Sequence, residues 1–510
     1  MILVHDFLEQ SAQRAPDKLA LVCDGQRLTY AQLDAMANRM ANALQSNGVG
    51  RGDRVVLFLP NSVELVVGIF ATLKANAVFV VINHTTKQDK LTYMVNNCRA
   101  KAIVCRARQS SMATAVLQNA PSLVYTIYTG DRADEAVVAS NDTTYEAIQE
   151  GYPAERPLRQ TIDQDLACLI YTSGSTGDPK GVMSAHCNVV FAVTSITTYL
   201  QNAPEDIVIC FSPLSFDYGL YQLLMVFKFG GTLVLEKGFT YPVQALKRME
   251  AERVTGFPGV PTIFAILLNM DLSSYDLRSL RYITNTAAAL PPSHIKKIGE
   301  LFPWATMYSM YGLTETKRTL YLPPEQLPNR PGSVGIAIPG TEVWIEDEAG
   351  ARLGPGQIGE LVIRGGHVMR GYWENPEATA KRYRPGPIPG ERVCYSGDLF
   401  RMDEEGFLYF VGRGDDIIKS RGEKVAPKEV ENVLYDLPGV VETAVIGIPD
   451  PILGEAIKAF VVTSDNDLTE KDILRHCRAH LEDFMVPQLV EFRSELPKTS
   501  SGKITKKDLA

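Results

Sequence analysis

The sequence predicts an α/β protein with a large N-terminal domain and a small C-terminal α+β domain. Apolar, strand-like runs alternate with helical segments through about residue 330, which is typical of parallel sheets covered by helices. From about residue 332 the pattern changes to short strands punctuated by glycine, and beyond residue 415 longer helices return. A chain of 510 residues is also too long for one hydrophobic core, so at least two domains are expected.

Apolar periodicity places the elements of the first 330 residues. Residues 6–14 and 31–46 show helical spacing, and the second helix is expected to end at Gly48. A helical segment at 62–74 separates two runs that are apolar throughout, as buried strands are. We expect two α/β subdomains here, with strands at residues 55–59, 77–82, 102–105, 207–211 and 232–236.

Glycine spacing and helical periodicity divide the remainder of the chain. Short strands at 342–345, 359–364 and 407–410 predict an antiparallel sheet or a small distorted β-barrel over residues 331–413. The expected domains are therefore residues 1–413 and residues 415–510, the second being a small α+β unit. Its predicted elements are helices at 426–436 and 469–482 and strands at 443–447 and 458–463.

Composition and charge exclude several classes of protein. Hydrophobic residues make up 45% of the chain and charged residues 22%, as in ordinary globular proteins. The formal net charge of −8 argues against non-specific binding to nucleic acid or to anionic membranes. The eight cysteines include no C-x-x-C pair, and the N-terminus lacks the basic start of a signal peptide. The longest apolar stretch, at 65–73, is too short for a membrane span, so we expect a cytoplasmic protein.

The most informative segment is the glycine- and hydroxyl-rich stretch YTSGSTGDPKG at residues 171–181. It follows an apolar strand at 167–170. Glycines let backbone N–H groups approach an oligophosphate, hydroxyls add donors, and Lys180 supplies positive charge. A flexible surface linker is the alternative, but the stretch is short and directly follows a buried-type strand. It is not a Walker A loop, because Pro179 precedes the lysine and Gly181 follows it.

Four further segments carry residues suited to nucleotide chemistry. Residues 311–315 (YGLTE) combine an aromatic ring, a hydroxyl and a carboxylate, which can stack a base, contact a phosphate and hold a hard cation. Residues 395–399 (YSGDL) place a carboxylate after a glycine turn, where it can grip ribose hydroxyls. The other two are residues 412–419 (GRGDDIIK), at the expected domain boundary, and the lysine-rich residues 497–507 near the C-terminus.

Taken together, these five motifs resemble those of the adenylate-forming superfamily of acyl-CoA synthetases, amino-acid adenylation domains and luciferases. The resemblance extends over nearly the whole chain, with the motifs in the same order. It implies ATP and Mg²⁺ as cofactors and a carboxylic acid as substrate. It also implies that the β- and γ-phosphates of ATP are bound by Thr172, Ser173, Gly174, Ser175, Thr176, Gly177 and Lys180.

The same resemblance assigns the other site residues. For the nucleotide, it implies that Tyr311 stacks on adenine beside Ala287 and Ala288, and that Asp398 and Arg413 hold the ribose. For the chemistry, it implies the α-phosphate contact Thr314, the Mg²⁺ ligand Glu315 and the lysine Lys503, which bridges the carboxylate and the α-phosphate. For the domain movement, it implies a hinge at Asp415 and a thiol channel beside Gly422.

Residues 213–220 (PLSFDYGL) bear on the identity of the acid. Many acyl-CoA ligases have a histidine where this chain has Phe216. The segment is more similar to amino-acid adenylation domains, whose aspartate pairs with the substrate ammonium. Asp217, with Tyr218 beside it, is therefore a candidate substrate anchor. The alternative is a turn or cap residue before a helix at 219–227.

The residues after Glu315 depart from the usual pattern. Thr316, Lys317 and Arg318 form an unusual continuation of the motif. We consider two hypotheses for the two cations: an extra charge near the pyrophosphate exit, or a surface salt bridge. The sequence favours the surface salt bridge.

The function predicted from the sequence is an AMP-forming ligase that joins a fatty, aryl or amino acid to a phosphopantetheine thiol. The segment 421–430 and the C-terminal lysine motif resemble those of acyl-CoA synthetases, so CoA is the first choice of acceptor. A free-standing amino-acid adenylation enzyme that loads a carrier protein is the close alternative. A catalytically silent binding protein on the same scaffold is an alternative of another class.

Overall fold

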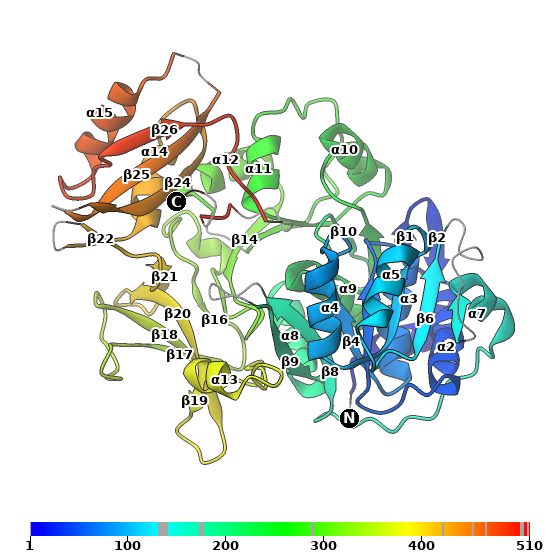
Figure 1. The fold of residues 1–510 in the computed structure, drawn as a ribbon. Helices are drawn as coiled ribbons and strands as arrows, with labels where there is room; N and C mark the ends of the chain where they lie inside the picture. Colours follow the sequence, from blue (N-terminus) through cyan, green and yellow to red (C-terminus); the bar gives the residue numbers. More distant parts are fainter. Residues whose placement is uncertain are drawn as a thin grey trace.

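The computed structural model describes residues 2–130, 141–172, 178–286, 290–420, 423–450, 453–464, 467–499, 504–506 and 509 (Figure 1). Within these residues the strands form four sheets. In Figure 1 the first two sheets are blue to green, the third is yellow and the fourth is orange to red. Among the described helices, none has the length and apolar character needed to cross a bilayer.

A mixed seven-stranded sheet lies in the N-terminal part. Its strands, in spatial order, are β7 (Asp142–Thr144), β6 (Tyr125–Thr129), β5 (Ala100–Arg106), β3 (Arg54–Phe58), β4 (Val78–Val81), β8 (Leu166–Thr172) and β9 (Lys180–Ala185). All neighbours are parallel except β8 and β9, which are antiparallel. The sequence pattern predicted parallel pairing, and it missed β9 because β9 returns directly from β8 through the phosphate-loop segment.

Helices cover both faces of this sheet. They are α2 (Tyr30–Ser46), α3 (Val63–Lys74), α4 (Gln88–Asn97), α5 (Ser110–Gln118) and α7 (Tyr145–Gly151), with a 3₁₀ turn at Ala107–Gln109. Side chains of a strand alternate between the two faces, so Val55 and Leu57 join the core that contains α2, α3 and α7. Val56 and Phe58 join the opposite core, with α4 and α5.

A nine-stranded sheet lies beside the first. Its strands, in order, are β16 (Ile336–Ala337), β15 (Leu320–Tyr321), β14 (Thr306–Tyr311), β13 (Tyr282–Asn285), β12 (Gly256–Gly259), β10 (Ile207–Cys210), β11 (Thr232–Leu235), β1 (Leu19–Cys23) and β2 (Gln26–Thr29). Pairing is parallel from β14 to β1 and antiparallel at both ends. Each parallel strand therefore ends at the same edge, which gathers the residues that follow β13 and β14.

One core joins the first two sheets. The helices of the second sheet are α1 (Asp6–Arg14), α8 (His186–Tyr199), α9 (Asp217–Phe229), α10 (Pro242–Ala251), α11 (Pro261–Leu267) and α12 (Pro292–Leu301). Phe227 of α9 stacks on Phe70 of α3 with ring centroids 5.2 Å apart. Both residues belong to one buried cluster that includes strands of both sheets, so the two α/β subdomains are packed as one body.

The third sheet is antiparallel, as the glycine-punctuated segment predicts. Its strands are β17 (Thr341–Glu346), β18 (Ile358–Gly365), β20 (Arg392–Met402), β19 (Tyr383–Pro385) and β21 (Leu408–Arg413), and it carries the helix α13 (Pro376–Arg382). β20 is central, with β18 on one side and β19 and then β21 on the other. Among the described residues, strand pairing does not close this sheet into a barrel.

The fourth sheet and two helices form the C-terminal α+β unit. Its elements are β22 (Ile418–Ser420), β23 (Glu423–Val425), α14 (Pro427–Tyr435), β24 (Val440–Asp450), β25 (Gly454–Thr463), α15 (Glu470–His480) and β26 (Leu489–Phe492). The unit has its own core, which includes Val430, Val445 and Ile473. Its α14 lies against α12, where the rings of Tyr435 and His294 are 5.5 Å apart. The domain boundary that we propose falls between β21 and β22.

Candidate active site

The phosphate-loop segment connects the two strands of an antiparallel hairpin. β8 ends at Thr172 and β9 begins at Lys180, and these two residues are direct partners in the register. Ser173, Gly174, Ser175, Thr176 and Gly177 lie between them and outside the described residues. The hairpin therefore fixes both ends of the segment and places the Lys180 ammonium 5.7 Å from the ring centroid of Tyr372.

A cavity of about 630 Å³ opens beside Lys180. Its lining combines cationic, acidic and aromatic side chains from β9, β18, the loop before α13, α13 and β20, including Lys180, Glu360, Tyr372, Arg382 and Tyr395. Concave sites lined by a few convergent polar groups are the usual form of a small-molecule site. The volume lies within the range of ligand pockets, so this cavity is the candidate nucleotide site.

Glu315 is held by two side chains that line this cavity and that the sequence motifs did not include. The Tyr372 hydroxyl donates a hydrogen bond of 2.5 Å to Glu315 Oε1, and Arg382 Nε lies 3.8 Å from the same oxygen. Burial, followed by the charge of Glu315, raises the pKa of Tyr372 and keeps its hydroxyl a donor. Burial is the largest single influence and opposes the charge of Arg382, but Glu315, Cys394 and Tyr372 together outweigh it, so the pKa of Arg382 is raised.

Tyr311 and Asp398, predicted to hold adenine and ribose, are in direct contact. Tyr311 ends β14, and its hydroxyl donates a hydrogen bond of 2.6 Å to Asp398 Oδ2. The ring also meets Phe400 edge to face, with centroids 4.9 Å apart. Burial and the charge of Asp398 raise the pKa of Tyr311. Two predicted nucleotide residues that are 87 positions apart in the sequence therefore meet at one point.

A bend in β20 positions Asp398. Gly397 has a φ of +71°, a left-handed conformation that glycine adopts without the strain of a side chain. A Cβ at Gly397 would approach Arg382 Nη1 to 2.6 Å, so a larger residue would also displace this arginine. Arg382 Nη1 donates to the carbonyl of Tyr395 at 3.0 Å. The bend thus couples the Asp398 side of the site to the Glu315 side.

Arg413 and Asp415 form an ion pair at the end of the third sheet. Arg413 is opposite Asp398 in the register of β20 and β21. Its Nε and Nη2 donate to the two carboxylate oxygens of Asp415 at 2.9 and 3.2 Å. The predicted ribose ligand therefore contacts the predicted hinge residue in this arrangement, and release of the pair would accompany any rotation at Asp415.

The loop that carries Thr314 and Glu315 is tightly folded. A Cβ at Gly312 would lie 1.7 Å from the Lys317 carbonyl oxygen, so a larger side chain does not fit there. The Lys317 ammonium donates to the carbonyl of Thr314 at 2.9 Å, and the Thr319 amide donates to the carbonyl of Tyr311 at 2.9 Å. These contacts fix the backbone of Thr314 next to the proposed nucleotide site.

The hypothesis of a surface salt bridge for Lys317 and Arg318 is wrong. The exposed fractions of the two residues are 0% and 2%. Lys317 lies over the ring of Tyr221 at 5.7 Å, and Arg318 lies over the ring of Tyr218 at 4.6 Å. The loop packs onto α9 and so turns both cations inward, a tertiary effect that single-sequence periodicity does not reveal.

Asp217 and Tyr218 begin α9 next to these cations. Asp217 is 7% exposed and is the first residue of the helix, whereas Phe216 is its N-cap, so the cap interpretation of Asp217 is wrong. The Tyr218 hydroxyl is within 2.7 Å of Thr284 Oγ1 and donates to the Thr284 carbonyl at 3.0 Å. Burial lowers the pKa of Lys317, and the nearby charge of Asp217 opposes this effect.

Several predicted site residues lie outside the described part of the chain. Their neighbours show where the chain leads: β13 ends at Asn285, which pairs with Ser309 of β14, and Lys498 bridges to Ile504 near the C-terminus. The predicted residues concerned are Ala287, Ala288, Gly422 and Lys503, in addition to the five of the phosphate loop.

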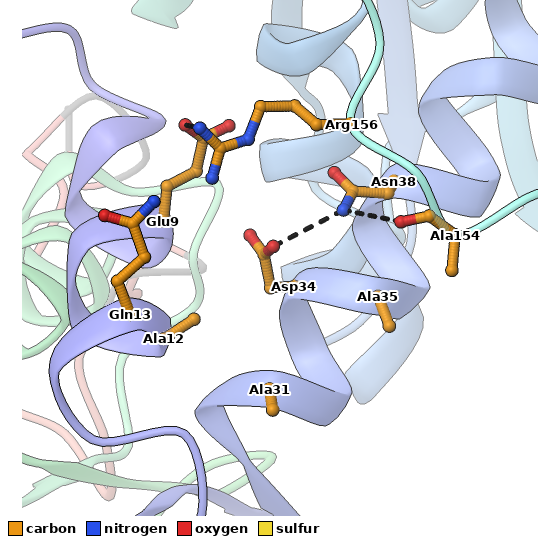
Figure 2. Close-up of a pocket in the computed structure, with 9 residues that line it drawn as sticks. All are labelled: Glu9, Ala12, Gln13, Ala31, Asp34, Ala35, Asn38, Ala154 and Arg156. Carbon is orange, nitrogen blue, oxygen red and sulfur yellow. Dashed lines mark hydrogen bonds and ion pairs between the residues drawn. The ribbon is translucent and has the colours of Figure 1, made fainter.

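A second cavity, of about 220 Å³, lies between α1 and α2 (Figure 2). Its charged side chains and Asn38 already have partners: Asn38 donates to Asp34 and to the Ala154 carbonyl, and Arg156 forms an ion pair of 3.0 Å with Glu9. Lys74 joins the same network at 2.9 Å from Glu9 and 2.7 Å from Asp34. We interpret this network as structural, because its charges neutralise one another.

Comparison with known proteins agrees with the fold. A family model described as AMP-binding enzyme matches residues 8–373, and one described as AMP-binding enzyme C-terminal domain matches residues 429–503. With the fold and the site above, these matches define an adenylate-forming enzyme. The chain belongs to the AMP-binding enzyme family.

Similar proteins are named as CoA ligases. The chain is 32% identical to a long-chain-fatty-acid–CoA ligase of Bacillus subtilis (strain 168), with 99% of this chain and 94% of that protein covered. It is 34% identical to a feruloyl-CoA synthase of an Amycolatopsis species, with 97% and 96% covered. The crystal structure of the anthranilate CoA ligase AuaEII with anthranoyl-AMP matches with a TM-score of 0.91 and 28% identity over 100% of this chain and 96% of that one. The protein is accordingly an AMP-forming acid–thiol ligase.

Proposed function

We propose that the protein activates a carboxylic acid with MgATP as an acyl-adenylate and transfers the acyl group to the thiol of CoA. The observation that carries this proposal is the meeting of Lys180 and Tyr372 at one cavity, with Glu315 hydrogen-bonded to Tyr372 behind it and Tyr311 in contact with Asp398. These residues come from four separate segments of the chain. Their meeting supports a single site for the phosphates, the metal and the nucleoside.

The phosphate side of the proposed site is built from the β8–β9 hairpin and Glu315. Lys180, Thr172 and the segment 173–177 would hold the β- and γ-phosphates by charge and by N–H and O–H donors. Glu315 fits Mg²⁺, which prefers carboxylate oxygen. Tyr372 and Arg382 both approach Oε1, so we assign Oε2 as the metal ligand. A bound Mg²⁺ would neutralise charge on the phosphates.

The nucleoside side follows from the edge of the second and third sheets. We assign Tyr311 to the adenine face together with the backbone at Ala287 and Ala288, which follow β13. Asp398 and Arg413 are assigned to the ribose hydroxyls. The register of β20 and β21 places these two residues opposite each other, which suits a grip on two adjacent hydroxyls.

The proposed chemistry needs no side-chain nucleophile. A carboxylate oxygen of the acid attacks the α-phosphorus, the bond to the β-phosphate oxygen breaks, and pyrophosphate leaves. The CoA thiolate then attacks the acyl carbon, and AMP leaves with the oxygen that came from the acid. The protein holds two anions in line and offsets the growing charge, which we assign to Lys503, Thr314 and the hairpin.

The two half-reactions require different arrangements of the C-terminal unit. We propose a rotation at Asp415 after adenylation, which withdraws Lys503 and brings the backbone near Gly422 to the thiol channel. Lys503→Ala is then expected to reduce adenylation about a thousandfold. Thiolation of a preformed adenylate is expected to fall much less, and equal losses in both half-reactions would contradict the assignment.

The acceptor and the acid are assigned by weighing the two alternatives. The chain resembles CoA ligases over nearly its whole length, which supports CoA rather than a carrier protein. The charge of Asp217 already favours the buried cation of Lys317, which disfavours an additional role in binding a substrate ammonium. We therefore propose a non-amino acid as substrate, and a cytoplasmic location, which supplies both ATP and CoA.

Exchange of radiolabelled pyrophosphate into ATP, screened over fatty, aryl and amino acids, tests this function. We expect acid-dependent exchange in the wild type and a loss of about a hundredfold in Glu315→Gln, which keeps the shape but not the charge. Glu342→Gln, on β17 away from the cavity lining and ion-paired with Arg352 and Arg364, is the matched control for a lost carboxylate. Absence of exchange over the whole panel would support a silent binding protein instead.

A further inference from the structure

Arg318 is a buried cation whose side-on hydrogen-bonding edge has no partner in the described part of the protein. It is 2% exposed, and its Nε and Nη2 atoms are buried without a hydrogen-bond partner among the described residues. An unpaired charge taken out of water is costly, so buried guanidinium groups are normally paired with carboxylates. This exception requires a physical explanation.

The surroundings of Arg318 leave one positive charge in excess. Lys317 is opposed by Asp217, and Arg382 is opposed by Glu315. None of the described carboxylates is paired with Arg318, whose guanidinium lies 4.6 Å from the ring centroid of Tyr218. The hydroxyl of Tyr221, one turn further along α9, is also buried without a partner in the described part of the chain. The cluster on this face of α9 thus lacks one anion.

Arg281 of the same protein shows which kind of group binds the Nε and Nη2 edge of a guanidinium. It too lies on a tyrosine, with its guanidinium 4.7 Å from the ring centroid of Tyr282. Its Nε and Nη2 donate to the two oxygens of the Asp206 carboxylate, at 3.1 and 2.6 Å. The same two atoms of Arg318 are the ones without partners. A planar anion with two oxygens, namely a carboxylate, matches this edge of a guanidinium.

The position of Arg318 indicates that this carboxylate belongs to the acid substrate. Arg318 contacts Tyr218, which belongs to the segment proposed to bind the acid, and follows Thr314 by four residues in a tightly folded loop. The phosphate side of the cavity has its own cations, Lys180 and Arg382. The missing anion is therefore better supplied by the acid than by ATP.

We propose that Arg318 binds a second carboxylate at the distal end of the acid, so that the preferred substrate is a dicarboxylic acid. This inference rests on the proposed function and narrows its substrate class. One carboxylate would react with ATP while the other remains fixed on Arg318. An aliphatic chain end would instead leave the guanidinium buried and unpaired, which makes a monocarboxylic acid of equal length the poorer substrate.

Matched pairs of acids test the proposal in the pyrophosphate exchange assay. Succinic, glutaric, adipic and terephthalic acids are compared with butanoic, pentanoic, hexanoic and 4-methylbenzoic acids. We expect at least one diacid to exceed its monoacid partner in kcat/KM by about a hundredfold, the discrimination typical of a site built for a polar group. Arg318→Met is expected to invert this preference, and Arg318→Lys is expected to retain part of it.

Arg281→Met is the control for the loss of a tyrosine-stacked arginine. It removes a paired guanidinium at the start of β13, whereas the loop of Thr314 follows the end of the neighbouring parallel strand β14. The ratio of diacid to monoacid is expected to stay unchanged, whatever fraction of the protein is folded. The ratio is independent of active concentration, so a less stable variant still gives an answer.

The outcomes separate this inference from the proposed function. No exchange with any acid would refute the function itself. Exchange with monoacids at equal or higher efficiency than with diacids would overturn the inference and leave the function standing. An equal loss for both members of each pair in Arg318→Met would also overturn it, because Arg318 would then act on the reacting carboxylate or on the fold.

Discussion

Two buried cationic centres of the N-terminal domain differ in whether their charges are matched. Lys74, 3% exposed, is surrounded by Glu9, Asp34 and Asn38 at 2.7–2.9 Å, and these three partners are drawn in Figure 2. Lys317 and Arg318 are equally buried, yet none of the described carboxylates is paired with Arg318. The first centre is complete within the fold, whereas the second is completed by a ligand. Burial of a charged group alone therefore does not indicate a binding site. Buried hydrogen-bond donors without a partner, such as those of Arg318, do indicate one.

The largest effect expected from this comparison is on stability. Lys74→Met leaves two acidic side chains without their buried cation, which should reduce the free energy of unfolding by about 3–5 kcal/mol. Arg318→Met removes an unmatched charge and orphans no acid, so a change within about 1 kcal/mol is expected. Denaturant unfolding of both variants measures the difference.

Lys237→Met is the control for the stability comparison, because Lys237 forms an exposed ion pair with Asp24. A change of less than about 1 kcal/mol is expected there. If Lys74→Met were no more destabilised than Lys237→Met, the charge network around Lys74 would not have the structural role that we infer.

An intermediate effect concerns pH and the histidines beside the matched network. Burial, despite opposing carboxylates, lowers the pKa of His186 to about 4, and burial together with His186 lowers the pKa of His5. Because the unfolded chain binds these protons near pH 6.5 and the native state does not, stability is lost as the pH falls from about 6.5 to 4. The slope is about 1.4 kcal/mol per pH unit for each histidine.

Thermal unfolding between pH 7 and pH 4 measures this slope. His186 accepts a hydrogen bond from the Val4 amide through Nδ1 at 3.1 Å, so the neutral ring is required. His186→Gln is expected to flatten the profile. A wild-type profile that is flat between pH 6.5 and 4.5 would show that these histidines are not held neutral.

The smallest effect is expected at Asp217. Asp217→Asn removes the negative charge that offsets the effect of burial on the Lys317 cation. A decrease in kcat/KM of less than about tenfold is expected for the best acid. Steady-state kinetics with that acid checks the size of the loss. If the Asp217→Asn variant lost turnover of amino acids, and the wild type accepted only amino acids, the amino-acid adenylation alternative would be supported instead.

Much of the fold follows from local pattern. The alternation of apolar runs and helical segments predicted the two N-terminal sheets, and glycine spacing predicted the antiparallel third sheet. The antiparallel strands β2, β9, β15 and β16 were not predicted, because an apolar run does not encode the direction of its neighbour. The same limit applies to closure of the third sheet.

The residues of the candidate site also divide into those that the sequence motifs located and those that they missed. The motifs located Tyr311 and Asp398, which are in contact, and Glu315 and Lys180, which share the cavity neighbour Tyr372. Tyr372 and Arg382 were missed, because a lone Gly-Tyr-Trp turn and a helical arginine carry little signal by themselves. The inward position of Lys317 and Arg318 depends on packing against α9, so charge pattern alone pointed to the surface.

The central claim is that the protein forms an acyl-adenylate. Its most direct test is a complete reaction with ATP, CoA and an acid whose carboxylate oxygens are oxygen-18, followed by mass spectrometry of the products. We expect one labelled oxygen in each AMP, because a carboxylate oxygen attacks the α-phosphorus and stays there when the thiol displaces AMP. Label in inorganic phosphate, or unlabelled AMP formed together with the thioester, would contradict it.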